Sequence, residues 1–136
     1  MRRRHLPLIL ALFAGCGGAV DPLSIEIDTT RLGLEPTMTS AKVRIYIGEI
    51  DQCTLLYVGN KERPVVPLYE ATVSVNAGAA QGRTSFNKIR PSTYMIGAWG
   101  YDQAGAEVAY GCATRVVIEE GVEAKAEIPM GLPPGK

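Results

Sequence analysis

YMIGAWGY at residues 94–101 is the stretch that decides the fold class of this chain. Side chains along a β-strand point alternately to its two faces, so this stretch predicts a strand with two distinct sets of side chains. One face carries Tyr94, Ile96 and Ala98. The other carries Met95, Gly97, Trp99 and Tyr101.

The sequence DQAG at residues 102–105 has the composition of a tight turn, and residues 107–118 alternate again. The apolar face expected for this second strand consists of Val108, Tyr110, Cys112, Thr114, Val116 and Ile118, with Glu107 and Arg115 opposite. Two alternating strands joined by a short turn predict a β-hairpin.

The same alternation continues outward from the hairpin in both directions. Further strands are expected at 23–27, 43–47, 53–57, 71–75, 84–86 and 122–128, with a mobile loop at 76–82 and a turn at 119–121. A chain of 136 residues has room for one domain, and most of its 15 Gly and 9 Pro fall outside these strands. The sequence therefore predicts an all-β fold, a single β-sandwich of about seven to eight strands over residues 23–130, followed by a C-terminal tail at 131–136.

The segment from Ile89 to Ile96 reads Ile-Arg-Pro-Ser-Thr-Tyr-Met-Ile. It is similar to a pattern of transthyretin-like, carboxypeptidase-regulatory-like domains, in which an apolar residue precedes a Pro-Gly pair and a Tyr. Ser92 stands where those domains usually have Gly. A resemblance covering about 45 residues, up to a last strand ending at Pro129, implies an Ig-like sandwich used as an accessory or interaction module in exported proteins.

Arg2, Arg3, Arg4 and His5 form a positive start. An apolar run, residues 6–13, follows and is too short to span a bilayer. Leu12-Phe13-Ala14-Gly15-Cys16 then resembles the bacterial lipobox. This resemblance implies a lipoprotein signal peptide at 1–15, cleavage before Cys16, and attachment of diacylglycerol and fatty acyl chains such as palmitate to that cysteine. The alternatives are a buried N-terminal strand and an ordinary signal peptide with a chance cysteine.

Several acyl chains on one residue anchor a protein stably, because each buried methylene contributes about 0.8 kcal/mol. Gly17 and Gly18 make residues 16–22 a flexible tether. In well-studied two-membrane bacteria an Asp directly after the lipidated cysteine favours the inner membrane, so Gly17 favours the outer membrane. The expected location is the bacterial cell envelope.

Cys53 and Cys112 remain once Cys16 carries lipid. An even pair of cysteines in an oxidising compartment predicts a disulfide bond. Two free buried thiols and a catalytic cysteine are the alternatives.

Composition excludes several activities. His5 is the only histidine and lies in the segment expected to be removed, which leaves no imidazole for nucleophile activation or metal binding. The mature chain has 11 basic and 14 acidic residues, a net charge of −3 without a basic cluster, so no nucleic-acid partner is expected.

Two pairs of carboxylates are close in sequence, Glu49 with Asp51 and Glu119 with Glu120. Both pairs have the sequence context of solvated turns. No enzyme activity, cofactor or metal site is predicted, and a calcium site from Asp51, Glu62 and Asp102 matches no known loop spacing.

Met95, Trp99 and Tyr101 form the one surface that the sequence suggests for a ligand. If Tyr94, Ile96 and Ala98 face the core, these three side chains form a flat outward aromatic strip that suits a sugar or a peptide. The alternatives are that Trp99 belongs to the core or is covered by the loop at 76–82.

The function expected from these features is that of a lipid-anchored structural or interaction domain. Its expected partners are membrane lipid, through Cys16, and another envelope protein. The alternative is a glycan- or peptide-binding module that uses the aromatic strip.

Overall fold

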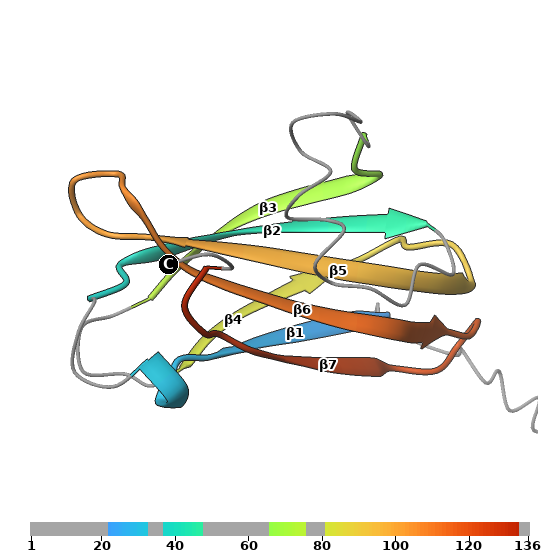
Figure 1. Ribbon diagram of the computed structural model, residues 1–136. Coiled ribbons are helices and arrows are strands. Elements are labelled where there is room, and N and C mark those ends of the chain that lie inside the picture. Colours follow the sequence, from blue (N-terminus) through green and yellow to red (C-terminus); the bar gives the residue numbers. More distant parts are fainter. Residues whose placement is uncertain (1–21, 33–36, 48–65, 76–80, 134–136) are drawn as a thin grey trace, which may run out of the picture.

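The computed structural model describes residues 22–32, 37–47, 66–75 and 81–133. Within these ranges the chain forms seven β-strands and one short 3-10 turn, Thr30–Leu32. The strands are β1 (Leu23–Asp28), β2 (Ser40–Ile47), β3 (Tyr69–Ser74), β4 (Gln81–Phe86), β5 (Ser92–Tyr101), β6 (Glu107–Ile118) and β7 (Ala124–Pro129). Figure 1 shows them stacked in two layers, which confirms the predicted all-β sandwich.

One layer is a three-stranded sheet in the order β4-β1-β7, and the other is a four-stranded sheet in the order β3-β2-β5-β6. All neighbouring strands are antiparallel except β1 and β7, which run parallel with Leu23 opposite Ala124. A parallel pair cannot be joined by a tight turn, and here nearly the whole domain lies between the two strands. The first strand, β1, is therefore the central strand of this sheet, and the last strand, β7, pairs with it as an edge strand.

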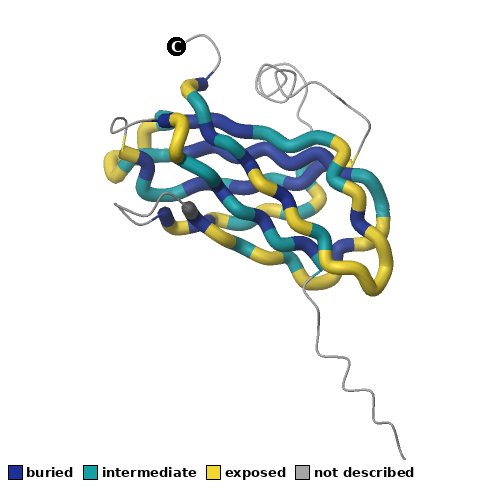
Figure 2. Tube along the Cα trace, turned by 90° about the horizontal axis from the view of Figure 1, so that it is seen from below, coloured by how far each residue is buried: buried dark blue, intermediate teal, exposed yellow. Residues whose placement is uncertain are grey.

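The main core lies between the two sheets and follows the predicted alternation. Leu23, Ile25 and Ile27 of β1 are fully buried, as are Ala41, Val43 and Ile45 of β2. Tyr94, Ile96 and Ala98 of β5 belong to the same core, so the predicted register of that strand is confirmed. Figure 2 shows this buried layer running along the sandwich, with exposed residues at the turns.

Tyr94 fixes the turn that carries the chain from β4 to β5. Its hydroxyl group donates a hydrogen bond of 2.6 Å to the carbonyl oxygen of Arg90, four residues earlier. A buried tyrosine that bonds back to the backbone at the start of a strand is the tyrosine corner of β-sandwich domains. Burial raises the pKa of Tyr94 above its ordinary value, and the nearby Tyr69 acts in the same direction.

The β5–β6 hairpin is confirmed, but the expected single face of β6 is wrong. The pairing register shifts between Tyr94 and Ile96 and again between Gly100 and Tyr101. Arg115 has a φ of 53°, the left-handed conformation that a bulge uses to insert an extra residue. Because each bulge reverses the alternation, Ala109 and Ile118 reach the main core while Tyr110 and Cys112 lie against the opposite face of the sheet.

Other strand boundaries differ from the sequence-based expectations by a few residues. β3 begins at Tyr69 rather than residue 71, and β7 begins at Ala124 because Val122 lies in the preceding turn. β4 begins at Gln81, so the predicted loop at 76–82 ends two residues too late. The predicted strand at 53–57 lies outside the described residues.

Gly111 in β6 lies where a side chain has no room. A Cβ atom at this position would approach Ile128 Cγ2 to 2.7 Å and both Met130 Sδ and the Pro129 carbonyl oxygen to 2.8 Å. The backbone of Gly131 pairs with Tyr110 in both directions, yet a Cβ atom on Gly131 would meet nothing within 4 Å. Both glycines have backbone conformations open to other residues, so the two sites differ in space alone.

We therefore expect Gly111→Ala to lower the free energy of unfolding by about 1–3 kcal/mol through overpacking. Gly131→Ala is the matched control and is expected to change it by no more than about 0.5 kcal/mol. Urea unfolding of the two variants measures the difference. Equal stabilities would show that β7 and the segment after it do not pack closely on β6.

Candidate functional site: the outer face of the four-stranded sheet

The four-stranded sheet has a second apolar layer on the face that points away from the main core. Tyr46, Met95, Trp99 and Tyr110 form this layer, which we name the outer cluster, and all four are buried. Tyr101 and Cys112 are partly buried against it. Three neighbouring strands, β2, β5 and β6, thus contribute to one patch.

Strand register brings the members of the outer cluster together. Met95 lies opposite Tyr46 of β2, and Trp99 lies between Lys42 of β2 and Tyr110 of β6. The Trp99 and Tyr110 rings have centroids 5.5 Å apart and an interplanar angle of 55°. Tilted aromatic pairs at this separation are favourable, because the edge of one ring meets the face of the other.

Arg44 closes one side of the cluster. It lies opposite Gly97, which has no side chain to compete for the space, and its guanidinium carbon is 5.2 Å from the centroid of the Trp99 ring. Its Nε atom also donates a hydrogen bond of 2.7 Å to Glu70 Oε2 on β3. One arginine therefore makes a cation–π contact and an ion pair, and links β3, β2 and β5 across the face.

Burial and the charges on this face together shift three pKa values. Burial acts to lower the pKa of Arg44, but the hydrogen bond to Glu70 and the neighbouring Tyr46 outweigh it and the pKa is raised. Burial raises the pKa of Tyr46, against the opposing effect of Arg44. Burial also raises the pKa of Tyr101, and the negative charge of Glu107 adds to this effect. Both tyrosines are therefore neutral over the physiological pH range.

The predicted aromatic strip lies on the predicted face but is not exposed. Met95 is 1% exposed and Trp99 is 3% exposed, while Tyr101 is half-buried. The Tyr110 ring and the Arg44 guanidinium group contact the Trp99 ring, and the buried Trp99 side chain presents no flat face for stacking on a sugar or a peptide. Alternation identified the face, but alternation carries no information about what packs on that face.

The remaining predicted site residues are distributed as follows. Cys16 and Cys53 lie outside the described residues, so the lipid attachment and the disulfide bond stay predictions. Cys112 is half-buried and packs against the outer cluster. Glu119 and Glu120 are exposed in the turn between β6 and β7.

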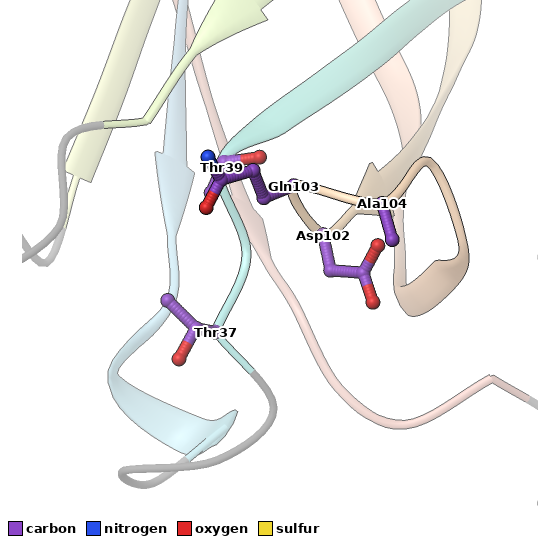
Figure 3. A pocket seen from close by; sticks show the side chains of 5 residues that line it. All are labelled: Thr37, Thr39, Asp102, Gln103 and Ala104. Atoms are coloured by element: carbon purple, nitrogen blue, oxygen red, sulfur yellow. The ribbon is translucent and has the colours of Figure 1, made fainter.

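An open depression of about 430 Å³ lies at one end of the sandwich, next to the β5–β6 turn. Its lining residues are Thr37, Thr39, Asp102, Gln103 and Ala104, and Figure 3 shows Thr37 standing apart from the others. The carboxylate of Asp102 accepts a hydrogen bond of 2.8 Å from the backbone N–H of Ala106. That carboxylate therefore serves to close the turn.

Two further features concern only the part of the chain that the structure describes. It contains no helix that is both long and apolar enough to cross a membrane. It also contains no group of three or more His, Cys, Asp or Glu side chains arranged to hold a metal ion.

Sequence reasoning did not identify Arg44, Glu70 or Tyr110 as parts of this site. The signal for Arg44 and Tyr46 was their position two residues apart in one strand, which places them on the same face. Glu70 carries no such signal, because its contact with Arg44 depends on the pairing of β2 with β3.

No known protein family, curated protein or solved structure matches this chain.

Because Trp99 is enclosed, we expect Trp99→Ala to lower the free energy of unfolding by about 3–5 kcal/mol. Val117→Ala is the control, since Val117 lies on a neighbouring strand and is 54% exposed, and it is expected to change stability by about 0.5 kcal/mol or less. Thermal and urea unfolding measure both effects. A Trp99→Ala variant as stable as the parent protein would mean that the ring is open to solvent.

Proposed function

We propose that this protein is a bacterial envelope lipoprotein, anchored by lipid on Cys16, whose β-sandwich acts as a structural or interaction domain outside the cytoplasm. The observation that carries the proposal is the sequence Leu12-Phe13-Ala14-Gly15-Cys16 after a basic and then an apolar segment. β1 begins at Leu23, seven positions after Cys16, so the proposed tether leads directly into the first strand.

We also propose that the sandwich is of the transthyretin-like, carboxypeptidase-regulatory-like kind. The resemblance over residues 89–96 supports this proposal, and so does the position of its residues in the fold. Pro91 lies in the turn before β5, and Tyr94 closes that turn through its bond to Arg90. The last strand ends at Pro129, as the resemblance implies.

A docking role fits this domain better than ligand binding on the aromatic strip. The binding alternative depended on an exposed Trp99, and that side chain is enclosed. The absence of histidine from the proposed mature chain argues against the common nucleophilic enzymes. The proposed partners are therefore the membrane lipid around the anchor and another protein of the cell envelope.

Replacing the lipid-bearing cysteine tests the proposal directly. We expect the parent chain, produced in a bacterium with a lipoprotein pathway, to sediment with membranes and to have the mass of a chain that starts at lipidated Cys16. Cys16→Ser is expected to lose both properties, because a hydroxyl group does not form the thioether. Cys53→Ser removes a different cysteine and is expected to keep both. A parent protein with an intact N-terminus and no lipid would contradict the proposal.

We further propose that Cys53 and Cys112 form a disulfide bond. Cys112 lies beside the outer cluster, so the bond would join the connection between β2 and β3 to the Trp99 face of the sheet. Closing a loop of about 60 residues stabilises a fold by roughly 4 kcal/mol in the chain-entropy model.

Alkylation of the denatured, membrane-extracted protein, followed by mass measurement, tests this bond. The expected result is no alkylation before reduction and two alkylated cysteines after it, because Cys16 carries lipid throughout. Two alkylated thiols in the unreduced protein would contradict the disulfide and leave the lipid anchor untouched.

A further inference from the structure

Large apolar side chains that are exposed are concentrated at one end of the sandwich. Among the described residues, six are more than half exposed, and all but Leu132 lie at this end, which we name the tether end. Its five apolar side chains, 52–79% exposed, are Ile47, Val66, Leu68, Val117 and Val122.

Strand pairing, one backbone hydrogen bond and the position of a turn place four of these residues at the same end, and Val66 precedes Leu68 by two residues. Ile47 ends β2 opposite Tyr94, and Val117 lies opposite Thr93, at the start of β5. Leu68 donates its backbone N–H to the carbonyl oxygen of Ile45, next to the end of β2. Val122 lies in the β6–β7 turn, which is at the right in Figure 1, at the same end as the arrowhead of β2.

The N-terminal segment joins the domain at the tether end. The carbonyl oxygen of Pro22 accepts a hydrogen bond of 2.9 Å from the N–H of Ala124, two residues after Val122. Pro22 lies six positions after Cys16, so a fully extended segment between them spans at most about 22 Å. Leu132 follows Gly131, which pairs with Tyr110 opposite Trp99, six positions along β5 from Thr93, so Leu132 lies roughly 20 Å along the sandwich from the tether end.

Charges at the tether end have both signs. Lys88 and Arg90 are exposed in the β4–β5 turn, and Glu119, Glu120 and Glu123 are exposed in the β6–β7 turn. A mixed set does not select an anionic surface, because attraction and repulsion offset each other. Contact at this end would therefore depend on apolar burial.

We propose that the tether end rests on the phospholipid bilayer, with its apolar side chains at the boundary between headgroups and acyl chains. The proposal rests on the lipid anchor at Cys16. A short tether brings this end close to the membrane, and exposed apolar side chains gain free energy there by leaving water. The sandwich then stands upright, with the β5–β6 turn and Leu132 directed away from the lipid.

Tryptophan quenching in liposomes of zwitterionic lipid tests this orientation with the full lipidated chain. Val122→Trp places a reporter at the tether end, and Leu132→Trp places one at the opposite end on a side chain of similar exposure. Trp99 is a common background in both variants. With lipid brominated in the upper acyl chain, we expect the added emission of Val122→Trp to fall at least about twofold and that of Leu132→Trp to stay unchanged.

The outcomes separate this proposal from the proposed function. A lipidated chain, verified by mass, in which Val122→Trp is not quenched or both variants are quenched equally would overturn the orientation and leave the anchor standing. Quenching of Val122→Trp that requires anionic lipid, or disappears in high salt, would overturn the apolar basis of the contact. A mass without lipid would overturn both proposals.

Discussion

Burial of β5 on both faces is the constraint on which the rest of the structure depends. Tyr94 and Ile96 enter the main core, while Met95 and Trp99 enter the outer cluster. Strands of antiparallel sandwiches usually keep one solvated face, and continuous burial is more typical of strands covered on both sides. β5 pairs with β2 and β6 along nearly its whole length, so the four-stranded sheet has two apolar layers, the main core on one face and the outer cluster on the other.

That arrangement explains where the polar contacts of the domain occur. Arg44 lies at the margin of the outer cluster, where its guanidinium group can contact the Trp99 ring and still bond to Glu70. On the three-stranded sheet the outward positions are polar, and Arg83 Nη2 lies 3.3 Å from Glu26 Oε2 on a solvated surface. Exposed ion pairs of the second kind contribute about 0–1 kcal/mol, whereas the arginine of the first pair also contacts the buried Trp99 ring. The two outer faces of the sandwich are therefore physically different.

Alternation predicted the strands well, because a two-residue apolar period is typical of half-buried strands and does not occur along one face of a helix. The inward set of β5 and the hairpin after it could be derived from residues 94–118 alone. Two features could not. The bulge at Arg115 has no sequence signature, since a non-glycine residue adopts its conformation only when the surrounding sheet requires it. The burial of Trp99 depends on packing over the face, whereas the pattern within a strand reports only which side a residue faces.

The edge strands β6 and β7 have features that limit pairing with other chains. β6 is the longest strand and an edge of its sheet, and an unprotected edge of this length can pair with other chains. Gly131 pairs with Tyr110 at one point along that edge, and the left-handed Arg115 bends the strand farther on. β7, the edge of the other sheet, is short and places Lys125 and Glu127 outward. Since the β6 edge is interrupted and the β7 edge is charged, strand addition by a partner is disfavoured at both of these edges. A docking partner would instead meet side chains at the ends or the outer faces of the domain.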